Sequence, residues 1–477
     1  MSLIHNAASN SLWIFLGRIS ERIVRLIVVM YLARIIGPSK FGIYTLAFAI
    51  AEFASVIAEV GMQRIVVREI ASDSENSSII FGSGLVLRMI FSFISWFVIC
   101  VVAILFITSP LERWSILSAS LLVFFSFRVA SLRQIFDAPF EAKLEMGLPS
   151  LIFVLSELIA GLAIVLFASM NFSIPSIIFI ELMCLGIGSV LLFFCSIKKL
   201  KPKWNIDFTM WKRLLRFSYP IAITNFLLIG YTRGDFLILD WMKDSESVGI
   251  YSSAVRLTGS LQIFPMAITT SLLPIISYKF ISSERERIEE IYRGIFSILL
   301  VFGMFVGLSV TFISSEIIDL AYGSQYKDAF LPLQISGWTQ FCSFLLYLLT
   351  TMIIGMGYER YFMFYGASLF TLKIILNVIL IPDYDYIGVS ISSLITEFIL
   401  MVVLILFLSK KVAYPCAKSI LVVVFSTFFA WLISNYVTDL SYLQFLLGFF
   451  IYFTLVFVLG GITTEGLNSV RRLLKWN

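Results

Sequence analysis

The apolar residues of this chain form long runs that short polar stretches separate. A helix needs about 20 predominantly apolar residues to cross a bilayer, and most of the runs reach that length. The connections leave no room for a separate soluble domain. The pattern therefore predicts an all-α polytopic membrane protein with about 14 transmembrane helices. The expected spans lie near residues 11–36, 41–63, 79–108, 114–136, 148–169, 174–197, 212–240, 248–278, 292–313, 329–356, 359–381, 386–409, 417–437 and 441–462.

The composition agrees with a membrane protein and excludes a soluble enzyme. Apolar residues make up 59% of the 477 positions and charged residues 14%, whereas soluble domains average about 25% charged residues. The single histidine, His5, lies near the amino end, and the five cysteines form no CxxC pair. We therefore predict no catalytic residues, no metal site and no bound cofactor. The modest excess of Lys and Arg, 35 against 30 acidic residues, gives no reason to expect a nucleic-acid partner.

Lysine and arginine are distributed unevenly between the two sets of loops. The loops after even-numbered helices and the carboxyl tail hold 22 of them, and the loops after odd-numbered helices hold five. Because cytoplasmic loops are enriched in these residues, both termini and the even-numbered loops are predicted to be cytoplasmic. A cluster of seven lies between the sixth and seventh helices: Lys198, Lys199, Lys201, Lys203, Lys212, Arg213 and Arg216.

One sequence pattern occurs at the start of both the second and the eighth helix. Residues 41–47 read Phe-Gly-Ile-Tyr-Thr-Leu-Ala, and residues 248–254, at an offset of 207, read Val-Gly-Ile-Tyr-Ser-Ser-Ala. A repeat that begins after an even number of helices keeps its orientation, so we predict parallel repeats with the substrate path between them. The predicted parts are an amino-terminal bundle (1–197), a basic cytoplasmic linker (198–216), a second bundle (217–409), and two additional helices with a cytoplasmic tail (410–477).

The first helix carries four ionisable residues, Arg18, Glu21, Arg22 and Arg25, on a single face. Their i, i+3, i+4, i+7 spacing stacks them over two helical turns. An ionisable group at bilayer depth costs about 2.5–3.5 kcal/mol on insertion scales, so this face is expected to meet protein or a watery cavity. Two interpretations remain open. The face is either a cavity-lining anion site, for which arginine suits phosphate or carboxylate, or a structural ladder in which Glu21 bridges Arg18 and Arg25.

Other spans contain further ionisable residues. Glu52 and Glu59 lie seven residues apart on one face of the second helix, and buried carboxylates of this kind can titrate near neutrality. They are therefore candidates for ion coupling, with pairing to the arginines of the first helix as the alternative. The second half contributes Arg233, Asp235 and Arg256 at similar depth.

Several short motifs follow one another in a distinctive order. In the first half they are Tyr-Leu-Ala-Arg-Ile-Ile-Gly-Pro at 31–38, Phe-Gly-Ile-Tyr at 41–44, Glu-Val-Gly-Met at 59–62 and Val-Arg-Glu-Ile-Ala at 67–71. In the second half they are Asp235, Val-Gly-Ile-Tyr at 248–251, Leu-Pro-Ile-Ile-Ser at 273–277, Tyr322 and Gly323 with Tyr326, and Asn-Val-Ile-Leu-Ile-Pro at 377–382 with Ile387 and Gly388. Over about residues 10–410 this set resembles the polysaccharide repeat-unit flippases of the multidrug/oligosaccharidyl-lipid/polysaccharide exporter superfamily.

The resemblance implies a fold of two pseudo-symmetric six-helix bundles around a central cavity, plus two extra carboxyl-terminal helices. It implies a flippase that moves an undecaprenyl-diphosphate-linked oligosaccharide from the cytoplasmic to the outer leaflet of the bacterial inner membrane. Alternating access driven by a proton or sodium gradient is also implied. The product would feed the biosynthesis of O-antigen or a related surface polysaccharide, with the polymerase and the chain-length machinery as further partners.

This hypothesis assigns roles to the buried polar residues. The arginine face of the first helix would offer a counter-charge to the diphosphate, and amide side chains would contact the sugars. The expected substrate-binding residues are Arg18, Arg22, Arg25, Arg233, Arg256, Asn225 and Gln262. The expected residues for ion coupling or charge pairing are Glu21, Glu52, Glu59 and Asp235.

Two other transporters of the same superfamily are alternatives. A lipid II flippase shares the fold and the substrate head group, and a cation-coupled multidrug antiporter shares the fold. The basic face of the first helix speaks against the antiporter, which an anionic cavity would favour. An integral-membrane polymerase or glycosyltransferase would need a sizeable catalytic loop, and no clearly polar loop here exceeds about fifteen residues.

Overall fold

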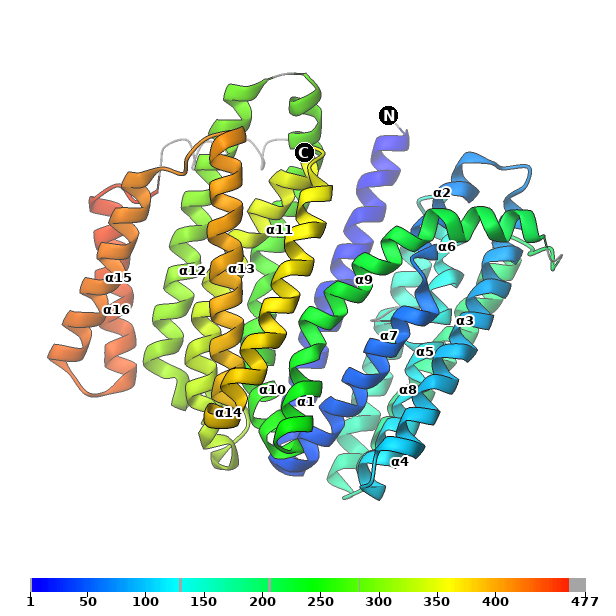
Figure 1. The fold of residues 1–477 in the computed structure, drawn as a ribbon, viewed down its shortest axis with the longest axis horizontal. Coiled ribbons are helices and arrows are strands. Elements are labelled where there is room, and N and C mark those ends of the chain that lie inside the picture. The colour runs from blue at the N-terminus through cyan, green and yellow to red at the C-terminus, as the bar shows by residue number, and fades with distance from the viewer. Residues whose placement is uncertain (1, 128–130, 205–206, 283, 463–477) are drawn as a thin grey trace. The chain divides into compact units, whose positions relative to one another are not determined.

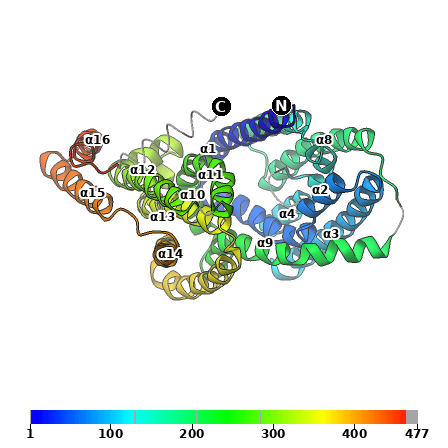
Figure 2. The same ribbon diagram turned by 90° about the horizontal axis from the view of Figure 1, so that it is seen from above.

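The computed structural model describes residues 2–127, 131–204, 207–282 and 284–462. Every regular element in these ranges is a helix (Figure 1), which confirms the predicted all-α fold. The chain divides into two compact units, Met1–Gly249 and Ile250–Asn477. Within each unit the long helices run side by side, so the view from above looks along many of them (Figure 2).

The first unit is built from long helices joined by short ones. α1 packs against α3, α7 and α9, and α8 packs against α7 and α4. The elements are α1 (Ser2–Glu59), α2 (Met62–Ser72), α3 (Ser77–Phe106), α4 (Pro110–Ala119), α5 (Leu122–Phe125), η1 (Leu132–Asp137), α6 (Ala138–Glu141), α7 (Gly147–Ser169), α8 (Ile174–Lys199) and α9 (Phe208–Met242).

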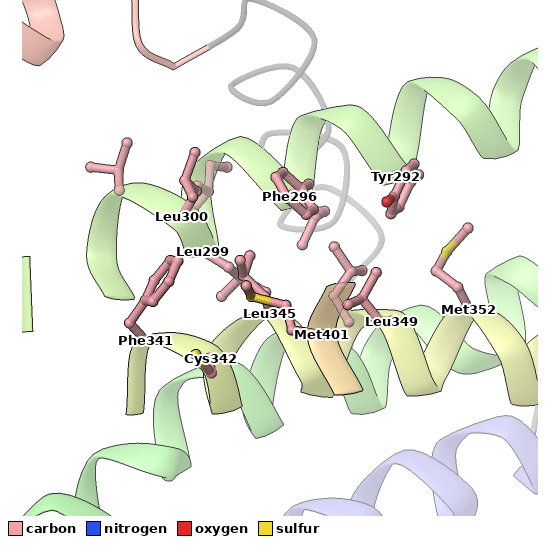
Figure 3. Packing of buried hydrophobic residues seen from close by; sticks show 14 of the residues in the cluster. Tyr292, Phe296, Leu299, Leu300, Phe341, Cys342, Leu345, Leu349, Met352 and Met401 are labelled. Carbon is pink, nitrogen blue, oxygen red and sulfur yellow. The ribbon is translucent and has the colours of Figure 1, made fainter. Parts of the chain in front are cut away.

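The second unit contains most of α10 and all the later helices. Its elements are α10 (Ser245–Gly259), η2 (Ser260–Gln262), α11 (Ile263–Ile281), α12 (Arg285–Ala321), η3 (Ser324–Ala329), α13 (Phe330–Gly355), α14 (Glu359–Lys411), α15 (Ala417–Val437) and α16 (Ser441–Val458). A core of apolar side chains joins α12 to α13, with Met401 of α14 beside them (Figure 3). Tyr292, Phe296 and Leu299 of α12 lie against Leu345 and Leu349 of α13, and this burial stabilises the unit.

Eleven helices in the described ranges are long and apolar enough to cross a membrane. The fourteen predicted spans are roughly consistent with that number, because two pairs merge and one span is broken. The first two spans join in α1, where Gly37 adopts φ 79° and ψ 169° ahead of Pro38. Only glycine adopts that conformation without strain, so one helical segment of α1 ends at this residue and a second segment begins after it. The spans at 359–381 and 386–409 join in α14, which has its irregular residue at Asp385.

The helix predicted over 114–136 is not continuous. It is divided into α4, α5 and η1, because polar side chains of neighbouring helices take up carbonyl groups that a regular helix would use itself. Ser189 of α8 donates to the carbonyl of Phe125, and Ser196 of α8 donates to that of Phe136. Arg88 of α3 donates twice to the carbonyl of Ser131. Apolarity alone does not reveal such a break.

The two copies of the repeated pattern approach each other through their glycines. A Cβ atom added to Gly42 would lie 1.5 Å from the carbonyl oxygen of Ser245, and one added to Gly249 would lie 2.0 Å from that of Pro38. The two contacts are related by the same offset of 207 residues. All four residues belong to the first unit. The backbones of α1 and α10 therefore meet directly, which a larger residue at either position would prevent.

Candidate functional site

The arginine face of α1 meets a buried carboxylate of α8. Arg25 forms an ion pair with Glu181, with 3.1 Å between Nη1 and Oε1. The hydroxyl of Tyr44, on the second segment of α1, donates to the other oxygen of Glu181 at 2.7 Å. The Glu181 side chain is fully buried and that of Arg25 is 16% exposed. Because the charges are desolvated, this pair depends on precise geometry far more than a surface pair does.

Further groups surround the guanidinium of Arg25. Glu157 of α7, which is 3% exposed, and Glu21 of α1 interact with it electrostatically. Arg25 also lies over the ring of Phe48, 5.6 Å from the ring centre. We refer to Arg25, Tyr44, Glu157 and Glu181 as the Arg25 cluster. It places one arginine among two buried carboxylates, so an anion that approached Arg25 would compete with carboxylates of the protein itself.

A second polar region joins α1 to α9. Glu52 forms an ion pair with Nε of Arg233, and the carboxylate of Glu59 accepts a hydrogen bond of 3.0 Å from the amide of Asn225. Close packing accompanies these contacts at Gly61, where an added Cβ would lie 2.6 Å from the carbonyl oxygen of Ser218. Both carboxylates thus contact side chains of α9, whereas the sequence suggested partners on the first helix.

Arg88 is a completely buried arginine that binds backbone groups. Besides its two bonds to the carbonyl of Ser131, it donates to the carbonyl of Glu59 at 2.9 Å and to the side chain of Gln134 at 3.0 Å. Glu59 is the last residue of α1, whose terminal carbonyls lack partners within the helix. A cation at the carboxyl end of a helix also suits its dipole. Arg88 therefore fixes the end of α1 that carries Glu59.

We expect Arg88→Met to lower the stability of the first unit strongly. The replacement leaves the carbonyls of Glu59 and Ser131 without these donors, and each unsatisfied buried group costs about 1–3 kcal/mol. Thermal unfolding of the purified protein in detergent measures the effect. Arg64→Met is the matched control because Arg64 is exposed, and equal unfolding midpoints for the two variants would contradict the role given to Arg88.

The second unit holds two of the predicted substrate-binding residues. Arg256 of α10 interacts electrostatically with Tyr322, whose hydroxyl donates to the carbonyl of Ser253 at 3.0 Å. The side-chain oxygen of Gln262 accepts a hydrogen bond of 3.4 Å from the hydroxyl of Tyr347. Both predicted residues thus have a tyrosine of their own unit nearby.

The structure places the remaining predicted site residues in different surroundings, and it does not describe the side chain of one of them. Arg22 lies partly buried on α1, and Asp235 is buried on α9 at 5% exposure. The side chain of Arg18 lies outside the described residues. The part of the chain that the structure describes holds no group of three or more His, Cys, Asp or Glu side chains arranged around a metal ion. The roles assigned to these residues stay predictions.

Glu157 and Glu181 were not selected as site residues from the sequence. A usable signal was present, because Glu157 is the only charged residue of α7 and Glu181 is the only one of α8 before its last two residues. A lone carboxylate in a long apolar helix has to face protein or water. What the sequence did not show is that both helices direct these side chains towards Arg25.

The chain matches two protein-family models. The model described as polysaccharide biosynthesis protein matches residues 7–280, and the MatE model matches residues 220–379. The first match covers more than half of the chain. The protein therefore belongs to the polysaccharide biosynthesis protein family.

Two curated relatives match parts of the chain. A Shigella flexneri protein named "Putative O-antigen transporter" is 23% identical over 279 residues, which cover 56% of this chain and 66% of the relative. "Uncharacterized membrane protein MJ1375" from Methanocaldococcus jannaschii is 26% identical over 204 residues, covering 42% of this chain and 45% of the relative. The matched region thus spans less than two thirds of either relative.

Solved structures share the fold across nearly the whole chain. The lipid II flippase MurJ in an inward closed conformation has a TM-score of 0.75 at 17% identity, covering 96% of this chain and 99% of that one. An inward-facing multidrug resistance MATE transporter of the MOP superfamily has a TM-score of 0.64 at 13% identity, covering 82% and 94%. At these identities the likeness concerns the fold.

Together these findings define the class. The protein is a multi-pass membrane protein of the polysaccharide biosynthesis protein family, and it has the fold shared by the lipid II flippase MurJ and the MATE transporters. The resemblance read from the motifs is thereby confirmed.

Proposed function

We propose that this protein moves an undecaprenyl-diphosphate-linked oligosaccharide, the repeat unit of O-antigen or a similar surface polysaccharide, across the bacterial inner membrane. The movement runs from the cytoplasmic to the outer leaflet by alternating access, driven by a proton or sodium gradient, with both termini in the cytoplasm. Membership of the polysaccharide biosynthesis family and the similarity to the Shigella protein named as an O-antigen transporter support this substrate class.

The observation that carries the proposal is the desolvated arginine of the Arg25 cluster. A lipid diphosphate brings negative charge to a depth where it has to be compensated, and arginine contacts phosphate oxygens in a bidentate manner. Arg25 lies one helical turn from Arg22 on the same face of α1. Its carboxylate partner Glu181 holds the guanidinium in place until phosphate oxygens replace that carboxylate. The guanidinium of Arg25 is thus already oriented to donate two hydrogen bonds before the substrate binds.

A gene deletion in the native host tests the proposal. Lipid-linked precursors are assayed separately on each leaflet, and surface polymer is examined on gels. We expect loss of full-length polymer and accumulation of single repeat units on the cytoplasmic leaflet, with the sugars identified by mass spectrometry. Unchanged polymer together with altered susceptibility to cationic dyes would favour a multidrug antiporter instead. Arrested peptidoglycan synthesis would favour a lipid II flippase.

A further inference from the structure

The first part of α9 differs from a transmembrane helix. α9 has 35 residues and is therefore about 52 Å long, well above the ~30 Å of a hydrocarbon core. Its apolar span covers Ile221–Met242, and the residues before it include three basic side chains. In Figure 1 this first part runs across the direction of α3, beside α2, before α9 bends into its long slanted part. Residues 208–219 are therefore placed as a helix at the membrane surface.

One face of this segment is anchored to the first unit. Leu214 and Ser218 are fully buried, and Leu214 belongs to an apolar core that also includes Met62 and Phe81. Arg213 forms an ion pair of 2.6 Å with Glu69 of α2. These contacts fix which side of the helix points away from the protein.

The opposite face carries a regular pattern of aromatic and basic side chains. Phe208, Lys212, Arg216 and Tyr219 follow one another at spacings of four, four and three, so they lie along one side of the helix. All four are exposed, Phe208 by 74% and Tyr219 by 59%. Trp204, just before the helix, is 53% exposed. We call these five residues the α9 surface face.

We propose that the α9 surface face binds anionic glycerophospholipid headgroups of the cytoplasmic leaflet. Helices that lie in the membrane interface combine basic residues with Trp, Phe and other apolar side chains, as here. Lys212 and Arg216 supply two cations at i and i+4 that meet lipid phosphates, and the flanking aromatic rings enter the headgroup region. The neighbouring exposed Lys201 and Lys203 extend the positive charge.

Charge complementarity identifies the occupant. Glu69 of α2, which packs beside this segment, is already engaged by both Arg213 and Arg68, and Asp73 is hydrogen-bonded to Asn76 and faces Arg213. An uncharged lipid would satisfy the aromatic side chains and leave the two cations without counter-charge. An anionic lipid meets the aromatic side chains and also supplies the counter-charge for the two cations. The lipid would thereby hold the linker between the sixth and seventh predicted spans against the membrane.

The test compares lipid retention by the purified full-length protein. Native mass spectrometry counts phosphatidylglycerol and phosphatidylcholine molecules retained from vesicles that contain both, and thermal unfolding is followed with each lipid alone. Wild-type protein is expected to retain phosphatidylglycerol preferentially and to unfold at a higher temperature with it. Lys212→Gln with Arg216→Gln is expected to weaken that retention about tenfold or more, since each basic residue near an anionic surface contributes several-fold. High salt should produce a similar loss.

The matched control is Lys40→Gln with Lys243→Gln, two exposed lysines on the loops predicted to lie on the other side of the membrane. This control should keep the wild-type preference. Equal retention of both lipids by the wild type, or an unchanged preference in the double α9 variant, overturns the proposal. These readouts involve no transport, so the inference stands or falls independently of the substrate proposed above.

Discussion

Replacing Gly42 with valine is expected to prevent normal folding of the first unit. Its Cβ would lie 1.5 Å from the carbonyl oxygen of Ser245, a backbone atom that no side-chain rotation can move away. Overpacking a core typically costs about 1–3 kcal/mol and more where the backbone has to shift. We expect the upper end of that range or beyond, which would lower the unfolding midpoint by about 6–12 °C if any folded protein is recovered.

Fluorescence-detected size-exclusion chromatography after heating measures this effect in detergent. Gly259→Ala is the matched control, because a Cβ at Gly259 meets no atom within 4 Å. That change should be neutral or stabilising by up to about 1 kcal/mol, as alanine is the better helix former. Gly249→Ala should resemble Gly42→Val rather than the control. Wild-type behaviour of Gly42→Val would show that α1 and α10 do not meet in this way.

Replacing Arg25 with methionine is expected to abolish transport and to destabilise the protein. Removal of one partner from a buried ion pair typically costs about 3–5 kcal/mol, because the other charge stays buried. Here the carboxylates of Glu181 and Glu157 would lose their guanidinium. The loss of transport alone would therefore not separate a substrate contact from a structural role.

A second variant separates the two roles. Arg25→Met combined with Glu181→Gln removes both charges of the pair, so most of the unfolding midpoint should return. Transport of the lipid-linked oligosaccharide, measured in reconstituted vesicles, should remain at least about tenfold below wild type, since a charge-assisted contact contributes about 1.5–3 kcal/mol. Wild-type transport by the double variant would limit Arg25 to a structural role and would remove it from the proposed substrate site.

Much of the fold could be predicted from the length of the apolar runs in the sequence. The spans predicted at 417–437 and 441–462 correspond to α15 and α16 almost residue for residue, because each is a plain apolar helix bounded by polar residues. The broken helix around α5 could not be predicted. Its cause lies in serines of α8 and in Arg88 of α3, far away in the sequence, and their hydrogen bonds replace bonds that a regular helix would form.

The site was predictable in part. Helical spacing predicted that the charges of α1 share one face, and the cost of burying charge required that they meet protein or water, as Arg25 does. Spacing along one helix does not show which other helix faces it. The pairing of Arg25 with Glu181 therefore needed the structure, as did the pairing of Glu52 with Arg233.

The reciprocal glycine contact has the form of an isologous interface. In such an interface residue i of one copy meets residue j of the other, and j meets i in return. Gly42 meets the residue four positions before Gly249, and Gly249 meets the residue four positions before Gly42. A half-length chain associating as a parallel homodimer would make this contact twice with a single glycine. In this single chain the two glycines are separate positions, yet each has to be glycine for its own half of the reciprocal contact to form.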